Sequence, residues 1–230
     1  MSQAGRPRPF LALDTSTPVG SVAVGRGDRL LAEVVMGVAV RHAEALMPAI
    51  DFALGRAGVT PPGLGGIVVA GGPGSFTGVR IAGAAAKGLA RALEVPLFAY
   101  SGLLALAAGA AACDGPVCAL FDARRDEVYA ACYRFDGGVR TLLRPAPRPL
   151  ASVLEELASE RVLYVGDGAL AHREAIEAAG GRVAPVHLAV PRAASLLWLV
   201  DVDPSGRVED AASWEPAYLR PSGAERATCG

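Results

Sequence analysis

Residues 10–36 read FLALDTSTPVGSVAVGRGDRLLAEVVM, and this stretch decides the fold of the first half of the chain. Its apolar runs at 10–14, 21–26 and 29–36 predict three strands, because each run is short and rich in aliphatic residues. Turn residues separate the runs: DTSTP follows the first, and a Gly-Asp pair follows the second. The chain is therefore expected to open with an antiparallel meander of three strands.

The segments that follow predict helices alternating with strands. Residues 42–57 carry apolar side chains at helical spacing, with Pro48 inside the helix. A buried strand, GIVVAG, is expected at 66–71, a long helix at 76–93 and a further strand at 97–100. This order predicts a mixed sheet with flanking helices, which is an α/β unit.

The second half of the chain repeats this order less regularly. Strands are expected at 116–122, 127–135, 139–143 and 162–166, and helices at 103–112, 152–159, 169–179 and 193–200. Two halves that each begin with a strand meander and continue with α/β segments suggest a duplicated fold. We therefore expect two domains, an N-terminal lobe of residues 1–100 and a C-terminal lobe with a tail, residues 101–230.

Composition and charge exclude several classes of protein. The 230 residues are 52% hydrophobic, which is enough for a core, and they carry 22 basic and 23 acidic side chains, for a net charge of −1. A nearly neutral chain does not bind nucleic acid or a membrane by charge alone. The uncharged run 95–113 is interrupted by Pro96 and by glycines, which favours a strand and a buried helix over a membrane span. We expect a cytoplasmic protein with no membrane segment.

The segment GGPGSFTGVR at 71–80 follows a predicted strand and has two interpretations. Glycine amides at a helix N-terminus can hold a phosphate group, which would place Gly72, Gly74 and Ser75 in a phosphate loop. The segment lacks a Gly-Lys-Ser/Thr sequence and also lacks the G-x-G-x-x-G spacing. The alternative is structural: the glycines permit a tight turn, and Ser75 caps the following helix.

The first predicted strand ends in DTST, where Asp14, Thr15 and Ser16 place an acid beside two hydroxyls. Such a group can hold a metal ion or a phosphate, but more often it forms an Asx turn. Metal binding has no further support, because His42 and the other two histidines lie far apart and none has a second His or Cys at ligand spacing. We expect neither a catalytic residue nor a metal site in this chain.

The predicted helix 76–93 has small or apolar side chains around most of its circumference. A helix on the surface of a sheet needs only one apolar stripe. The helix is therefore expected to pack on its sheet with one side and against a second helix with another. That second helix belongs either to the same chain or to a partner.

Five blocks of this sequence resemble the bacterial TsaB (YeaZ) family: LALDTST with SVAV, RHAEALMPAI, GGPGSFTGVRIAGAAAKGLA, FDARRDEVYAACY and the terminal EPAYLR. The blocks occur in order from residue 11 to residue 220. The resemblance implies two tandem α/β lobes of the actin, hexokinase and chaperone ATPase superfamily. It also implies a role in attaching threonylcarbamoyl to the adenosine next to the anticodon of tRNAs that read codons starting with A.

The resemblance further implies a non-catalytic subunit. Family members are expected to dimerise with the catalytic paralog TsaD through two helices of the N-terminal lobe, and an ATPase, TsaE, joins the complex. The same surface would form a homodimer when TsaD is absent. ATP and metal are then expected on the partner subunits, and tRNA is reached only through the complex. The residues expected near the contact with TsaD are Leu46, Ile50, Val79, Ala82 and Ala86.

The chain departs from the catalytic paralog in two places. The H-x-x-x-H metal pair of the paralog is reduced here to His42, and its adenosine-binding segment is degraded to VGDGALAHREA at 165–175. The two loops around DTST and GGPGS are then vestigial phosphate loops. Two alternatives are an ATP-dependent small-molecule kinase of the same superfamily and a tRNA-binding module that uses Arg124, Arg125 or Arg220.

Overall fold

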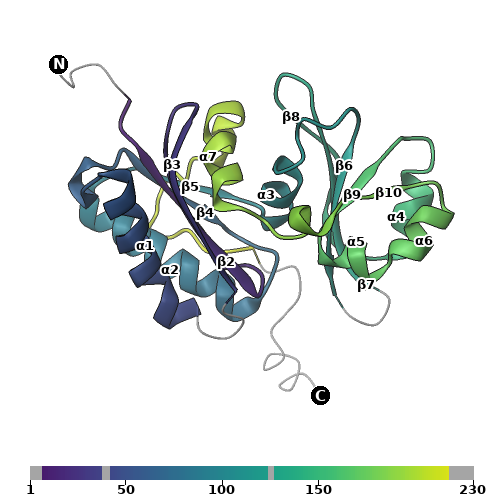
Figure 1. Ribbon diagram of the computed structural model, residues 1–230, viewed down its shortest axis with the longest axis horizontal. Coiled ribbons are helices and arrows are strands. Elements are labelled where there is room, and N and C mark those ends of the chain that lie inside the picture. The colour runs from purple at the N-terminus through teal and green to yellow at the C-terminus, as the bar shows by residue number, and fades with distance from the viewer. Residues whose placement is uncertain (1–6, 38–41, 124–126, 218–230) are drawn as a thin grey trace.

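The computed structural model describes residues 7–37, 42–123 and 127–217, which form two α/β lobes (Figure 1). The first lobe holds a mixed sheet of five strands: β1 (Phe10–Asp14), β2 (Val19–Arg26), β3 (Arg29–Gly37), β4 (Gly66–Ala70) and β5 (Leu97–Tyr100). They lie in the order β3-β2-β1-β4-β5. The meander β1-β2-β3 is antiparallel, whereas β4 runs parallel to β1 and to β5.

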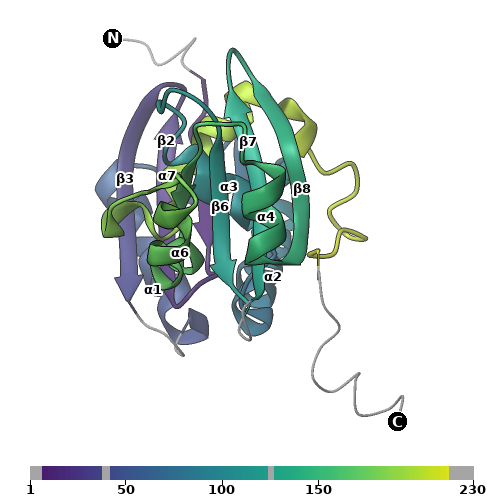
Figure 2. The same cartoon turned by 90° about the vertical axis from the view of Figure 1, so that its right-hand side faces the viewer.

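The second lobe repeats this topology. Its strands are β6 (Val117–Asp122), β7 (Glu127–Phe135), β8 (Val139–Pro149), β9 (Leu163–Val165) and β10 (Arg182–Val183). Their order, β10-β9-β6-β7-β8, is the order of the first sheet when the strands are counted within each lobe. The duplication predicted from the sequence is therefore present. Figure 2 shows β3 and β8, which end the two meanders, along opposite rims of the molecule.

Helices cover the outer face of each sheet and fill the space between the sheets (Figure 1). The outer face of the first sheet carries α1 (His42–Ala57) and α2 (Phe76–Leu93), as predicted. The outer face of the second carries α4 (Leu150–Glu156), α5 (Asp167–Ala171) and α6 (Arg173–Ala178). No helix among the described residues is long and apolar enough to cross a membrane.

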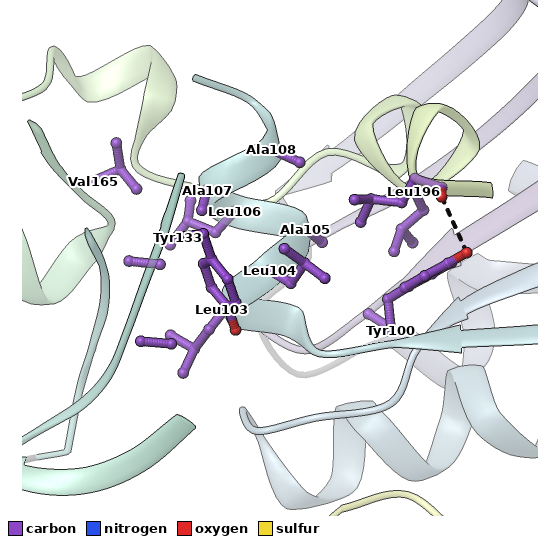
Figure 3. Close-up of a cluster of buried hydrophobic side chains, with 14 of the residues drawn as sticks. Tyr100, Leu103, Leu104, Ala105, Leu106, Ala107, Ala108, Tyr133, Val165 and Leu196 are labelled. Atoms are coloured by element: carbon purple, nitrogen blue, oxygen red, sulfur yellow. Dashed lines mark hydrogen bonds between the residues drawn. The ribbon is translucent and has the colours of Figure 1, made fainter. Parts of the chain in front are cut away.

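The two lobes share one core, which is built around α3 (Gly102–Ala108) and α7 (Ala193–Val202) (Figure 3). All seven residues of α3 are buried, so this helix has no face in water. Its leucines and alanines pack between Tyr133 and Val165 of the second sheet and Leu196 of α7. The hydroxyl of Tyr100 lies within hydrogen-bond distance of the carbonyl oxygens of Leu199 (3.1 Å) and Asp203 (2.6 Å), which fixes α7 to the first lobe.

The C-terminal part of the chain returns to the first lobe. Helix α7 packs on β1, β2 and β4, and the amide of Val208 then donates to the carbonyl of Leu97 over 2.9 Å. Further on, the ammonium group of Lys87 on α2 donates to the carbonyl of Trp214 over 2.7 Å. The expected division at residue 100 thus separates the two sheets, whereas residues 193–217 pack with the first lobe.

Strand β8 is longer than the predicted segment 139–143 and runs on through Pro145, Pro147 and Pro149. Prolines argue against a strand inside a sheet, because they lack an N–H donor. They are tolerated here because β8 lies at the edge of its sheet and pairs only with β7. The predicted helix 169–179 is likewise found as two shorter helices, α5 and α6.

The first turn of α2 is pressed against the loop that follows β1. The hydroxyl of Thr15 donates to the carbonyl oxygen of Gly78 over 2.6 Å. A Cβ on Gly78 would lie 1.9 Å from the carbonyl oxygen of Thr15, closer than any side chain can come. Gly88 lies ten residues along the same helix. Apart from the adjoining backbone of its own helix, no described atom lies within 4 Å of the position of its missing Cβ. Only the first of these two glycines is required by the fold.

Gly78→Ala and Gly88→Ala should therefore change stability in opposite directions. We expect Gly78→Ala to lower the free energy of unfolding by more than about 2 kcal/mol, because the loop after β1 must move away from α2. Gly88→Ala should raise it by about 0.5–1 kcal/mol, because alanine loses less backbone entropy in a helix. Urea unfolding followed by circular dichroism measures both. Equal effects of the two substitutions would contradict the packing described for Gly78.

Candidate functional site

A cavity of about 350 Å³ lies between the lobes, where β1 and β4 end. Ligands of open α/β sheets bind at such strand ends. The structure here brings the DTST loop and the GGPGS loop together, as the vestigial-site interpretation requires. The cavity is lined by Ser16, Thr17, Pro18, Gly74, Ser75, Phe121, Asp122, Tyr129 and Asp167.

The DTST loop forms a turn whose polar groups bond to one another and to α2. The Oδ1 atom of Asp14 accepts hydrogen bonds from the amide and the hydroxyl of Ser16, both over 2.7 Å. The Thr15 hydroxyl donates its hydrogen bond to the carbonyl oxygen of Gly78 on α2. This is the Asx-turn alternative of the sequence analysis.

The glycines of the GGPGS loop allow other backbone segments to pack closely against it. The loop does not form an open anion site. The amide of Ser75 donates to the carbonyl of Ser16 over 2.7 Å, and the Ser75 hydroxyl accepts from the amide of Gly78, which confirms the predicted helix cap. A Cβ on Gly74 would lie 2.3 Å from the Ser16 carbonyl oxygen. Gly72, with φ of +92°, makes room in the same way for the carbonyl of Ala217. The amides of Ser75 and Gly78 are thus already occupied.

The second lobe contributes acidic groups to the cavity. The carboxylate of Asp167 accepts hydrogen bonds from the amides of Asp122 (3.2 Å) and Gly168 (2.9 Å), and partial burial raises its pKa. The described residues that line the cavity include two aspartates and neither lysine nor arginine. A negative lining disfavours a phosphate group. In the segment VGDG, Gly166 lies against the backbone of β6: its Cβ would be 2.1 Å from the Leu120 carbonyl oxygen.

Asp14 is buried beneath these loops. It has no exposed surface, and its Oδ2 atom has no hydrogen-bond partner among the described residues. Burial raises the pKa of Asp14 to about 6, and the two hydrogen bonds from Ser16 oppose this shift only in part. The folded chain therefore binds the Asp14 proton more tightly than the unfolded chain does.

His42 ties α1 to the same loop. Its side chain is buried, and its Nε2 atom lies 2.9 Å from the carbonyl oxygen of Thr17, to which an Nε2–H donates. From the sequence, His42 is interpreted with Glu44 as the start of the 42–57 helix, which agrees with α1 beginning at His42. The sequence gives no signal for its contact with Thr17. The described residues contain no cluster of three or more His, Cys, Asp or Glu side chains placed to hold a metal ion.

The five residues expected near a partner face the interior of this chain. Leu46, Ile50, Ala82 and Ala86 belong to the core on the outer face of the first sheet. Val79 is buried as well. Their exposed fractions are Leu46 1%, Ile50 2%, Val79 2%, Ala82 0% and Ala86 0%. A partner that docks on these two helices would meet other side chains.

The opposite side of α1 and α2, which we call the outer helical surface, consists of Met47, Phe52, Phe76, Ala84 and Gly88 with their exposed neighbours. Met47 is 52% and Phe52 62% exposed, and the guanidinium of Arg80 lies 3.9 Å from the ring centre of Phe76. Clustered exposed apolar side chains mark interaction sites. The sequence signal that could have found them is Phe52, an aromatic residue out of phase with the buried stripe of α1. Arg124, Arg125 and Arg220, considered for tRNA contact, lie outside the described residues.

Comparison with known proteins gives a consistent set of matches. The family model described as "TsaD: tRNA N6-adenosine threonylcarbamoyltransferase" matches residues 36–227. The tRNA threonylcarbamoyladenosine biosynthesis protein TsaB of Bacillus subtilis is 34% identical over 225 residues, which cover 94% of this chain and 96% of that protein. The protein of the same name from Escherichia coli is 30% identical over 219 residues, covering 92% and 94%. Among solved structures, "YeaZ from Pseudomonas aeruginosa" superposes with a TM-score of 0.77 at 33% identity, covering 92% of this chain and 99% of that one.

The burial of Ala82 makes a direct prediction about α2. Ala82→Arg should lower the free energy of unfolding by more than about 3 kcal/mol, because it forces a charged side chain into the packed layer between helix and sheet. Ala84→Arg, two residues away on the exposed side, should change it by less than about 0.5 kcal/mol. Urea unfolding of both variants checks this. Similar stability of the two would contradict the orientation of α2.

The burial of Asp14 predicts a dependence of stability on pH. The pKa rises from 3.8 in the unfolded chain to about 6 in the folded one, so the folded state binds the proton more tightly. Below about pH 3 both states are protonated. Between pH 4 and pH 7 the wild-type free energy of unfolding should fall by about 2–2.5 kcal/mol relative to Asp14→Asn, because the folded state holds the proton that the unfolded state releases.

Urea unfolding at several pH values between 4 and 7 measures this difference. Asp51→Asn, which changes an exposed aspartate of α1, is the matched control and should follow the wild-type curve. A constant difference between wild type and Asp14→Asn across this range would show that the Asp14 carboxyl does not titrate as stated.

Proposed function

The chain belongs to the TsaB (YeaZ) family of tRNA threonylcarbamoyladenosine biosynthesis proteins, and we propose that it acts in that pathway as a non-catalytic scaffold subunit. In this proposal it binds the catalytic paralog TsaD and supports threonylcarbamoyl transfer to the adenosine next to the anticodon of tRNAs that read codons starting with A. The observation that carries the proposal is the outer helical surface. This surface exposes the large apolar side chains of Met47 and Phe52 on α1 beside the small residues Ala84 and Gly88 on α2.

The small residues of α2 support a helix–helix contact. Ala84 and Gly88 lie one turn apart on the exposed side. The axis of a partner helix can therefore approach the axis of α2 to about 8 Å, the lower limit for packed helices. Gly88 costs about 0.5–1 kcal/mol of helix stability, and nothing in the described chain occupies the space of its missing Cβ. The same holds for Gly55 on α1. A partner that packs closely there would account for both glycines.

The cavity between the lobes supports the non-catalytic part of the proposal. A kinase of the same superfamily would use these loops to hold the phosphates of ATP. Here the Thr15 and Ser16 hydroxyls and the Ser75 amide are occupied by contacts within the chain, and aspartates line the opposite wall. In the proposed complex, ATP and metal are therefore bound by partner subunits and not by this chain alone.

The remaining partners follow from the same scheme. The ATPase TsaE joins the complex of the two subunits, and tRNA contacts the assembly rather than the isolated chain. When TsaD is absent, the outer helical surface is available to a second copy of this chain. The site of action is the cytoplasm, where the tRNA substrate is found. The two sheets of identical strand order fit the duplicated lobes of the actin, hexokinase and chaperone ATPase superfamily.

Phe52→Glu tests the proposal. The side chain is 62% exposed, so the variant should fold, but a carboxylate in an apolar helical contact should raise the Kd for TsaD by about 100-fold. The matched control is Val186→Glu, which places the same charge at a 72% exposed residue of the second lobe. Titration calorimetry with TsaD measures binding, and threonylcarbamoylation of tRNA by the reconstituted proteins measures function.

The scaffold role requires both measurements to change together in Phe52→Glu and neither in Val186→Glu. Unchanged TsaD binding would place the contact elsewhere on the chain. Normal tRNA modification without binding would show that TsaD does not need this subunit. Micromolar ATP binding by the isolated chain would instead favour the kinase alternative.

A further inference from the structure

Two cysteines face each other inside the second sheet. Cys118 on β6 is the direct partner of Cys132 on β7 in the antiparallel register. Both belong to the core on the outer face of that sheet, and neither has exposed surface. Both are free thiols in the structure. A single buried cysteine is an ordinary small apolar residue, but two cysteines in register on neighbouring strands bring two sulfur atoms together.

The hydrogen bonds between β6 and β7 place the two cysteines in the closer class of cross-strand pair. The amide of Ala123 donates to the carbonyl of Glu127 over 3.0 Å, which marks these two residues as a hydrogen-bonded pair. From there the register runs without a shift to the cysteines. Hydrogen-bonded and non-hydrogen-bonded pairs alternate along an antiparallel ladder. The cysteines lie an odd number of positions from the first pair, so they form a non-hydrogen-bonded pair.

A pair of this class suits a disulfide bond. Its Cα atoms lie about 4.5 Å apart, and its side chains come closer together than those of a hydrogen-bonded pair. Disulfides join residues whose Cα atoms are about 4.4–6.8 Å apart. The register therefore already gives Cys118 and Cys132 the separation that a cross-strand disulfide needs, without a shift of either strand.

We propose that Cys118 and Cys132 are a redox-sensitive pair, which forms an intrachain disulfide by exchange with a low-molecular-weight disulfide. The thiolate of one cysteine attacks a sulfur atom of the small disulfide, which forms a mixed disulfide and releases one small thiolate. The thiolate of the other cysteine attacks the protein sulfur of the mixed disulfide, which forms the bond between the two cysteines and releases the second small thiolate. The two cysteines are oxidised. The small disulfide is reduced to two thiols, which take up the two cysteine protons.

The helices that cover the pair control when it reacts. Burial raises the pKa of the Cys118 thiol, and the neighbouring Cys132 thiol raises it further, so the closed fold disfavours the reactive thiolate. The covering helices are short: α4 has seven residues, α5 five and α6 six. Helices of this length depend on packing for their stability. Local opening of this layer is therefore the step that admits the oxidant and lets the thiols ionise.

The native register also predicts the effect of the bond on stability. A disulfide that joins residues in unsuitable positions strains the folded chain. A disulfide that matches the pairing of β6 with β7 leaves the folded chain unstrained and restricts the unfolded chain, so it stabilises the fold. The oxidised chain should therefore stay folded and unfold at a higher urea concentration than the reduced chain.

Incubation of the full chain with glutathione disulfide, in urea below the unfolding transition, tests the proposal when it is followed by alkylation and peptide mass spectrometry. We expect a disulfide between Cys118 and Cys132 that dithiothreitol reduces, and a raised urea midpoint of the oxidised chain. Cys132→Ala should stop at a mixed disulfide on Cys118. The matched control Cys113→Ala removes a partly exposed thiol outside the pair and should form the bond as the wild type does.

A second pair of variants tests the role of the covering helices. Val153→Ala removes buried contacts of α4 and should speed formation of the bond by about tenfold, because the layer opens more often. Val69→Ala makes the same change in the core of the first lobe and should leave the rate near that of the wild type. Equal rates in the two variants would contradict control by the covering helices.

Three results on the wild-type chain would overturn the proposal, and they decide it even where a variant fails to fold. The first is that the two cysteines stay reduced at every urea concentration below the transition. The second is that they pair with other cysteines instead of with each other. The third is a lower urea midpoint of the oxidised chain, because the bond would then strain the fold.

Discussion

The backbone of the loop after β1 meets the backbone of the first turn of α2, and this contact determines what the first lobe can present to a partner. At Gly78 there is no room for a side chain, and the carbonyl and hydroxyl of Thr15 both face that residue. The contact fixes which side of α2 lies on the sheet. It also engages the Thr15 hydroxyl, which a phosphate loop would offer to a ligand. The contact that orients α2 therefore also leaves fewer free polar groups at the strand ends.

Local sequence patterns predicted the parts of the fold that depend on local chemistry. The strands at 10–14 and 66–71 follow from short aliphatic runs between turn residues, and the cap at Ser75 follows from its hydroxyl beside a helix start. The two loops that meet at the cavity were found for the same reason. The pattern could not decide between a phosphate loop and a turn. That choice depends on contacts between Ser16 and residues about sixty positions away.

The sequence contained a signal for the orientation of α2 that the list of expected contact residues did not use. Arg80, Lys87 and Arg91 lie on one side of the helix, and helical spacing places Ala84 on that charged side and Ala82 opposite it. The structure agrees, because it buries Ala82 and exposes Ala84. The return of α7 to the first lobe, in contrast, has no local signal, since it depends on contacts such as that of Tyr100 with Leu199, 99 residues apart.

A feature that the chain's own fold does not require is the most direct structural argument for a partner. Gly78 is explained by the contact it allows, whereas Gly88 weakens its helix and contacts nothing in the space it leaves open. Val35 is comparable on β3, because it adds apolar surface to an edge that water must solvate. The two positions lie on different sides of the first lobe, one over α2 and one at the rim of the sheet. The two positions therefore belong to separate surfaces, and substitution at either one leaves the other surface intact.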